Sequence, residues 1–271
     1  MATEMLGFPP IRRAGMSPED VNPAKVVAKL ASRAALGEAD IEAVLAIPIT
    51  ARWWNRAAYL VREGAPPGNW CRLVSSGLAF RHKLTAAGAR QIVALHVPGD
   101  FLDFEPLFLA RADCNLQALT PLLTIEIERT ALRELILRRP NIGRALWIDA
   151  LIDAGITREW VVNVGRRDAR TRIVHLLCEF VARMRLAGLP ENHGYELPMT
   201  QEQIGDAVGI TSVHVNRVLR ALAGEGLIRR ERRHLICGTL DAMRSAGEFN
   251  PLYLHIGRAA APRDADDFND G

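Results

Sequence analysis

A chain of 271 residues, 49% hydrophobic and 24% charged, has the composition of an ordinary globular protein, and its length favours two domains over one. No apolar run reaches the roughly 18 residues of a membrane-spanning helix, and residues 1–10 lack the basic stretch and apolar core of a secretory signal. Composition therefore excludes an integral membrane protein, and we expect a cytoplasmic protein with no membrane partner. The formal net charge of +3 does not by itself indicate a nucleic-acid partner.

The four cysteines lie far apart in the sequence, at Cys71, Cys114, Cys178 and Cys237. No pair has the CxxC or CxH spacing of zinc and iron–sulfur sites. We expect four reduced thiols, as is usual in the cytoplasm, and no metal site. A regulatory role for one of these thiols stays open.

Both ends of the chain lack a regular pattern. Residues 1–23 are rich in Pro, Gly and Met and are expected to form a flexible extension, and residues 257–271 carry a run of aspartates typical of a disordered acidic tail. Between Ala24 and Ile47 apolar residues recur at helical spacing with an interruption near Gly37, which predicts two short helices.

Short apolar runs separated by turn signals fill residues 59–128, and we expect a strand at each: Tyr59–Val61, Cys71–Val74, Leu78–Leu84, Gln91–Val97 and Leu122–Ile127. The turns are marked by sequences such as Ser75-Ser-Gly77 and Pro98-Gly99-Asp100, and they recur about every 8–15 residues, a spacing typical of a sandwich, barrel or jelly roll. In the last run, Leu122–Glu128, apolar and polar side chains alternate, which predicts one buried face and one face in water. Residues 24–139 are thus expected to form a jelly-roll sensor domain with flanking helices.

Residues 140–167 are predicted to form one long helix. Pro140 occupies a first-turn position, where its missing N–H costs nothing. Large side chains recur every three to four residues along one stripe: Trp147, Leu151, Ala154, Arg158, Val161 and Val164. A helix of about 25 residues is roughly 37 Å long, and so long a stripe favours a coiled-coil-like dimer seam. Packing of the stripe on the chain's own β domain is the alternative.

A second helical region follows a break near Asp168. Thr200 and Gln203 have the spacing of a capping box, which starts a helix. Gly209 suits a turn that needs a positive φ, and Thr211 can cap the next helix. Two helices joined by a glycine turn predict a helix-turn-helix.

The second of these helices has a polar outer face and is followed by a basic hairpin. Six arginines and two glutamates lie between Ser212 and Leu235. Arginine can donate two hydrogen bonds to guanine, and asparagine can pair with adenine, whereas arginines of a wing neutralise phosphates. We expect residues 168–256 to be a winged helix-turn-helix that binds double-stranded DNA through Thr200, Thr211, Ser212, Val213, His214, Asn216, Arg217, Arg220, Arg229, Arg230 and Arg232.

Turn, hinge and recognition motifs follow one another in a familiar order: Gly64, Gly77, Pro98-Gly99-Asp100-Phe101, the long helix from Pro140, the Asn163…Asp168…Arg172 region, and the helix-turn-helix. Over about residues 59–240 the chain resembles the CRP/FNR family of transcription regulators. The resemblance implies an α+β protein with an N-terminal β jelly roll like that of cyclic-nucleotide-binding proteins, a long central dimerisation helix and a C-terminal winged helix-turn-helix. It also implies a homodimer on a two-fold symmetric operator, an effector in the N-terminal domain, and RNA polymerase as a partner.

The chain departs from the family pattern at the effector site. Asp103-Phe104 stands where cyclic-nucleotide-binding members carry Gly-Glu, and Asp113-Cys114 or Cys114-Asn115 stands where they carry the Arg-Ser or Arg-Thr pair that grips the cyclic phosphate. Arg111 lies two or three residues out of register. An effector pocket is still expected at Asp103, Phe104, Arg111 and Cys114, but without tight binding of cyclic AMP.

The cysteines and histidines bear on other cofactors and on other classes of protein. Oxygen-sensing members use an N-terminal cysteine cluster, and no cysteine precedes Cys71, so we expect no iron–sulfur cluster and predict no cofactor. His82, His96 and Cys71 leave a haem- or thiol-based sensor open. A cupin-like metal-binding protein is the main alternative, although His82 and His96 do not form a His-x-His pair; a protein–protein adaptor is a further one. No nucleophile or phosphate-loop motif occurs, so we do not expect an enzyme.

In the recognition helix, Val213 stands where the best-known members have an acidic residue. Because valine cannot accept a hydrogen bond from cytosine, the operator is expected to differ from theirs.

Overall fold

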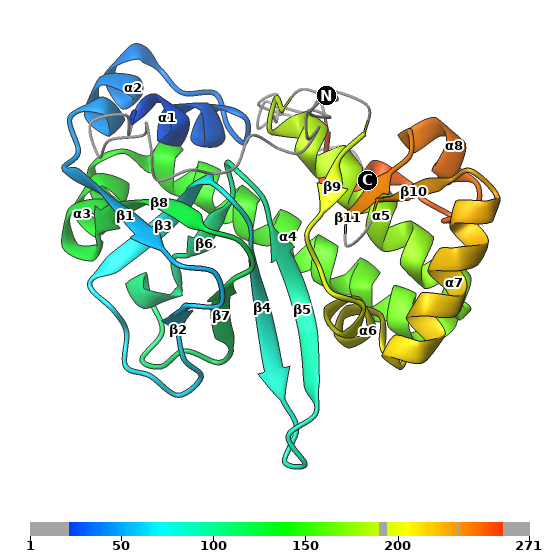
Figure 1. The fold of residues 1–271 in the computed structure, drawn as a ribbon. Helices are drawn as coiled ribbons and strands as arrows, with labels where there is room; N and C mark the ends of the chain where they lie inside the picture. Colours follow the sequence, from blue (N-terminus) through cyan, green and yellow to red (C-terminus); the bar gives the residue numbers. More distant parts are fainter. Residues whose placement is uncertain (1–21, 190–193, 232–233, 257–271) are drawn as a thin grey trace, which may run out of the picture.

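The computed structural model describes residues 22–189, 194–231 and 234–256. The predicted extension and acidic tail, and Arg232 of the predicted hairpin, lie outside these residues. Within them, an N-terminal β domain and a C-terminal, mainly helical domain are joined by one long helix (Figure 1).

The β domain is a jelly roll of two four-stranded antiparallel sheets. Its strands are β1 (Ile49–Trp54), β2 (Tyr59–Val61), β3 (Trp70–Ser76), β4 (Ala79–Leu84), β5 (Arg90–His96), β6 (Phe101–Asp103), β7 (Asn115–Ala118) and β8 (Leu122–Glu128). One sheet has the order β1-β8-β3-β6 and the other β2-β7-β4-β5. Five of these strands coincide with the predicted apolar runs. β1, β6 and β7 were not predicted, because β6 and β7 are short and β1 has no clear alternation.

Two short helices precede the sheets, as predicted: α1 (Ala24–Ala31) and α2 (Glu38–Leu45). Val26, Leu30 and Val44 are buried in one core cluster with β3, β8 and the start of the long helix. The helices therefore close one end of the β domain (Figure 1).

The outer face of β8 differs from the prediction. Its apolar side chains are buried as expected, but Thr124 and Glu126 are also only 0% and 3% exposed. Trp54 Nε1 donates to Thr124 Oγ1 at 3.0 Å, and Arg72 pairs with Glu126. The expectation of a water-facing side was wrong because both faces of the strand are covered, one by the core and one by polar partners inside the roll.

One turn of the roll requires glycine. Gly77 joins β3 to β4 with φ +84°, and a Cβ built there would lie 2.3 Å from the carbonyl oxygen of Pro121. Any other residue would have to move the β7–β8 turn as well as adopt an unfavourable backbone conformation.

Three helices follow the β roll in the chain: α3 (Arg129–Arg138), the long helix α4 (Pro140–Arg166) that joins the domains, and α5 (Ala169–Leu186), which begins the C-terminal domain. α4 has 27 residues and matches the predicted long helix. α4 ends at Arg166, and α5 begins at Ala169. The Asp168 side chain accepts hydrogen bonds from the backbone N–H groups of Arg170 and Thr171 and so caps α5. The break is the hinge expected from the sequence.

The C-terminal domain continues with β9 (Glu196–Leu197), α6 (Gln201–Val208), α7 (Ser212–Gly224), β10 (Ile228–Glu231), β11 (His234–Cys237), α8 (Leu240–Arg244) and the 3-10 turn η3 (Pro251–Leu254). β10 and β11 form the predicted hairpin, and β9 adds a third strand in the order β10-β11-β9. Two residues are too few to show a strand pattern, so β9 was missed.

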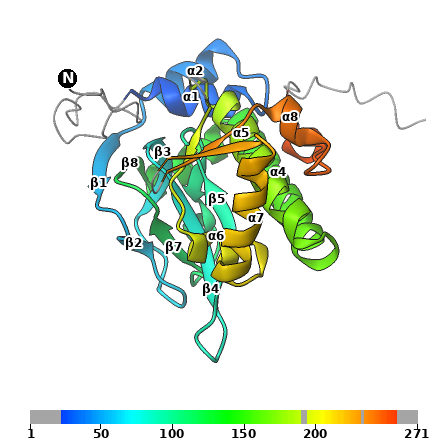
Figure 2. The same ribbon diagram turned by 45° about the vertical axis from the view of Figure 1, so that its right-hand side comes forward.

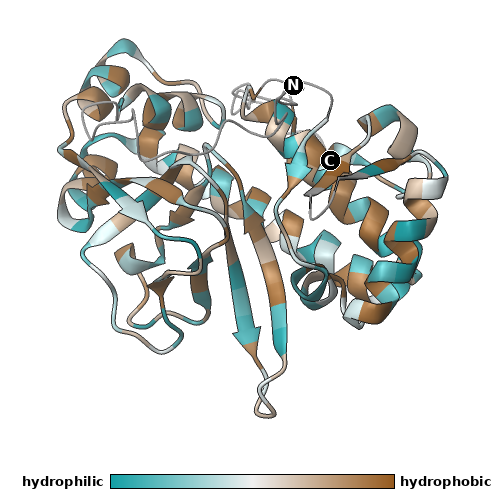
Figure 3. Ribbon diagram, viewed as in Figure 1, coloured by the Kyte–Doolittle hydropathy of each residue, from teal (hydrophilic) through white to brown (hydrophobic). Residues whose placement is uncertain are grey.

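The two domains share part of their core. Phe80 and Ile92 of the β4–β5 hairpin belong to the same buried cluster as Ile204 and Val208 of α6, and Figure 2 shows β5 beside α6. Polar contacts add to this packing, because Arg90 pairs with Asp206 at 2.7 Å. Apolar residues line the inward sides of the helices in both domains (Figure 3). Among the described residues, no helix is long and apolar enough to cross a bilayer.

Candidate nucleic-acid interface and ligand cavities

The α6–turn–α7 unit is held by the local interactions that its sequence predicts. The Thr200 hydroxyl accepts from Gln203 N at 3.1 Å, and Gln203 Oε1 accepts from Thr200 N at 2.9 Å, which completes the capping box. Gly209 has φ +69° at the end of α6, and Thr211 Oγ1 accepts from His214 N at the start of α7. These interactions fix the angle at which α7 leaves the turn.

The outer face of α7 is polar and open. Val215, Val218, Leu219 and Leu222 are buried against the domain, while Thr211, Ser212, Val213, Arg217 and Arg220 are exposed on the opposite face. His214 and Asn216 are half-buried, and Gln201 Nε2 donates to Asn216 Oδ1 at 3.4 Å. Seven of the predicted contact residues therefore share one accessible side of a single helix and its cap.

The hairpin that follows α7 places Arg229 on its exposed side. Arg230 lies on β10 opposite Leu235 in the ladder, and Arg232 falls outside the described residues. Thr200 is exposed at the start of α6. The predicted interface is thus brought together from the two helix starts, the outer face of α7 and the wing.

The hinge is tied directly to the helix-turn-helix. Asn163 Nδ2 donates to the carbonyl oxygen of Arg172, and Arg172 donates to Arg167 O at 2.8 Å and to Val208 O at 3.2 Å. Val208 is the last residue of α6. A shift of α4 against α5 would therefore move the turn that positions α7.

The predicted stripe on α4 is largely exposed. Trp147 is 68%, Leu151 62% and Val161 67% exposed, and Arg158 is exposed between them. Ala154 is half-buried. Val164 does not belong to this surface, because its Cγ1 would lie 3.1 Å from a Cβ built on Gly209, so it packs on the helix-turn-helix. Three large apolar side chains in water on one helix face form a surface that suits a partner.

A cavity of about 320 Å³ lies within the β roll. Of the four residues expected at an effector pocket, Asp103, Arg111 and Cys114 line this cavity. The Phe104 ring packs on Phe101 in a T-shaped arrangement and lines a second cavity outside the roll. Arg111 donates to the carbonyl oxygen of Gly64 at 2.9 Å. Phe104 lies outside the roll cavity because the chain turns after β6.

Two arginines of the roll cavity were missed from the sequence. Arg72 pairs with Asp103 at 2.5 Å and with Glu126 at 3.0 Å, and all three side chains are almost fully buried. Burial, together with the neighbouring Glu105, raises the pKa of Asp103 to about 7 although Arg72 lowers it. Arg81 pairs with Glu105 at 2.6 Å. The guanidinium groups of Arg72 and Arg81 are therefore already engaged by carboxylates.

The cysteine side chains and His82 are buried or half-buried inside the protein. Burial raises the pKa values of Cys71, Cys114 and Cys178 to about 12, which disfavours the reactive thiolate. His82 packs between Tyr59 and Phe80. In the part of the chain that the structure describes, no group of three or more His, Cys, Asp or Glu could hold a metal ion.

The structure combines three parts: a jelly roll, a long helix with an exposed apolar stripe, and a winged helix-turn-helix. This combination defines the class of two-domain regulators that join a sensor domain to a DNA-binding domain. Two family descriptions match the chain: "Cyclic nucleotide-binding domain" over residues 51–139 and "Crp-like helix-turn-helix domain" over residues 171–245. The chain belongs to the CRP/FNR family of transcription regulators.

Curated relatives and solved structures agree with this assignment. The transcriptional activator protein FnrL of Cereibacter sphaeroides is 32% identical over 60% of this chain and 66% of its own length, slightly less than two thirds. The nitrogen fixation regulation protein FixK of Bradyrhizobium diazoefficiens is 28% identical over 57% of this chain and 64% of its own length. The structure of FixK2 from Bradyrhizobium japonicum superposes with a TM-score of 0.67 at 22% identity, covering 74% of this chain and 98% of that one.

Proposed function

We propose that this protein is a sequence-specific, DNA-binding transcription regulator that acts as a homodimer on a two-fold symmetric operator. The exposed polar face of α7, with Ser212, Arg217 and Arg220 on a helix that Thr211 caps, is the observation that carries the proposal. A helix with this outer face has the dimensions and the donors to read base edges in the major groove. Its relatives are described as transcriptional activators, which makes RNA polymerase the expected protein partner.

The exposed stripe of α4 supports the dimer. Trp147, Leu151 and Val161 lie at intervals that bring them to one side of the helix, and burying them against a second copy would remove a large apolar surface from water. A two-fold axis along this seam would present two copies of α7, as a palindromic site requires.

Selection of bound DNA from a random pool tests the proposal directly. The expected result is an enriched site with two-fold symmetry and half-sites about one helical turn apart. Recovery of no common sequence, or of a single half-site only, would contradict it. Repeating the selection at two salt concentrations separates specific binding from phosphate binding.

Arg217 and Arg229 are expected to play different roles on DNA. Arg217→Ala should cost about 1–3 kcal/mol and relax specificity at one guanine, because a bidentate contact to a base edge is lost. Arg229→Ala should weaken binding to all sequences and flatten the dependence of affinity on salt. Fluorescence anisotropy on the selected site and on random DNA measures both effects. Equal losses on the two DNAs for both variants would show that the roles are wrongly assigned.

Cyclic AMP is not expected to bind at micromolar concentrations. Its phosphate would have to displace Asp103 and Glu126 from Arg72, and both are buried. Isothermal titration of the full chain should show no heat of binding. Asp103→Asn removes one of the two competing carboxylates and is the variant in which weak binding should first appear. A micromolar dissociation constant for the unmodified protein would refute the prediction.

A further inference from the structure

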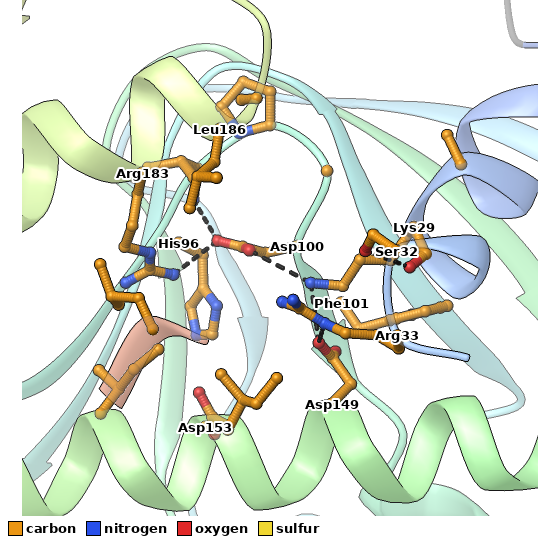
Figure 4. Close-up of a pocket in the computed structure, with 18 of the residues that line it drawn as sticks. Lys29, Ser32, Arg33, His96, Asp100, Phe101, Asp149, Asp153, Arg183 and Leu186 are labelled. Atoms are coloured by element: carbon orange, nitrogen blue, oxygen red, sulfur yellow. Dashed lines mark hydrogen bonds and ion pairs between the residues drawn. The ribbon is translucent and has the colours of Figure 1, made fainter. Parts of the chain in front are cut away.

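A second and larger cavity, of about 880 Å³, lies between the two domains, and we call it the interdomain cavity. Its walls come from α1, from the turn between β5 and β6, from the middle of α4, and from α5 and η3 of the C-terminal domain (Figure 4). It is distinct from the cavity within the roll, although Arg81 and Glu105 border both. Its volume falls within the range of small-molecule sites.

Most charged groups around the interdomain cavity are paired with one another. Four carboxylates each have a cation within 3.6 Å, in the pairs Lys29–Asp149, Arg33–Asp149, Lys29–Asp100, Arg183–Asp100, Arg183–Glu179 and Arg81–Glu105. The Lys25 ammonium instead donates to the carbonyl oxygen and the hydroxyl of Ser75. These groups form a scaffold with few free hydrogen-bonding positions.

Two polar side chains remain without a partner. Within the described residues, the Asp153 carboxylate makes no ion pair or hydrogen bond, and burial raises its pKa although Arg81 and Arg183 lower it. His96 is only 2% exposed, and its Nε2 has no hydrogen-bond partner among those residues. Figure 4 shows the His96 ring pointing into the cavity above Asp153, which projects from α4. Buried polar groups are rarely left unsatisfied unless something else satisfies them.

The Asp153 carboxylate and the His96 imidazole favour a ligand that donates hydrogen bonds. A carboxylate only accepts hydrogen bonds, and burial holds the pKa of His96 well below its ordinary value, so the imidazole is neutral. A neutral imidazole has one donor and one acceptor nitrogen, and a donor placed at Nε2 selects the tautomer in which the proton is on Nδ1. Apolar side chains also line the cavity, among them Ile152, Ile156 and Leu186. A ligand that fits has a charged donor at one end and an apolar body at the other.

We propose that the interdomain cavity binds a small protonated amine with an apolar body, whose ammonium group donates to Asp153 and to His96 Nε2. The ligand contacts α4 and the β5–β6 turn on one side and the C-terminal domain on the other, so its binding biases the position of the helix-turn-helix. The proposal names an effector class for the regulator and rests on the proposed function for that role, but not for binding itself.

Calorimetric titration of the full chain with 2-phenylethylammonium tests the proposal, with the neutral 2-phenylethanol and the anionic phenylacetate as probes of matched size. The ammonium is expected to bind at least about 10-fold more tightly than either, because only it forms a charge-assisted hydrogen bond with Asp153. An equal or higher affinity for the alcohol or the acid would overturn the proposal. This comparison uses the unmodified protein and does not depend on how a variant folds.

Asp153→Asn keeps the size of the side chain and removes its charge. Affinity for the ammonium should fall about 10-fold, while Asp241→Asn on the exposed side of α8 should leave it unchanged. Unchanged affinity in Asp153→Asn would refute the site. These titrations contain no DNA, so amine binding without any DNA binding would reject the proposed function alone, and DNA binding without selective amine binding would reject the cavity alone.

Discussion

Leu151→Glu on α4 is expected to convert the protein from a dimer to a monomer and to lower its affinity for operator DNA by about 10²–10⁴-fold. Leu151 is 62% exposed in the single chain, so the substitution should hardly change the stability of the monomer. At a dimer seam the same glutamate would have to be buried opposite its own copy, which costs far more than the apolar contact it replaces. A monomer can then bind only one half-site of the operator at a time.

Light scattering during size exclusion measures the mass, and fluorescence anisotropy measures the affinity. Leu137→Glu is the matched control, because Leu137 is 76% exposed on α3, away from the stripe, and it should leave the dimer intact. A Leu151→Glu protein that remains dimeric would place the interface elsewhere. A protein that is monomeric before substitution would contradict the dimer itself.

The helix-turn-helix could be predicted residue by residue, and the reason is that its determinants are local. The Thr200 capping box, the positive φ of Gly209 and the Thr211 cap each involve residues at most three positions apart. The buried and exposed faces of α7 follow from helical periodicity alone. Val164 shows the limit of this reasoning, since periodicity placed it on the seam of α4 while contact with Gly209 turns it to the domain.

The cavities could not be predicted in the same way, because their residues meet only through strand pairing and domain packing. Arg72, Asp103 and Glu126 come from three neighbouring strands of one sheet, 54 residues apart along the chain at the extremes. A signal was present in the sequence: Arg72 interrupts the apolar run at Cys71–Val74, and an arginine inside a buried strand needs carboxylate partners. The interdomain cavity has no counterpart in sequence motifs, since His96 of β5 and Asp153 of α4 are brought together only by the packing of the long helix on the roll.

Arg183→Met should lower the free energy of unfolding by about 3–5 kcal/mol, the usual cost of breaking a buried ion pair. Arg183 is 8% exposed and links the two domains, because it pairs with Asp100 of the β domain at 2.7 Å and with Glu179 of α5 at 3.3 Å. Its removal would leave both carboxylates buried without a guanidinium. Arg170→Met on the same helix is the matched control: the side chains of Arg170 and its partner Glu225 are 39% and 45% exposed, and their pair should contribute no more than about 1 kcal/mol.

Urea denaturation of both variants over a range of pH separates this ion pair from simple packing. Burial would raise the pKa of Asp100, but Arg183 and Lys29 outweigh it and hold the pKa far below its ordinary value. A depressed carboxyl pKa contributes stability above the unfolded pKa of about 4 and loses it as the pH falls further. The difference between the unmodified protein and Arg183→Met should therefore be constant near neutral pH and should shrink below about pH 4. A difference that stays constant down to acid pH would show that the methylene packing of Arg183, and not its charge, holds the C-terminal domain on the β roll.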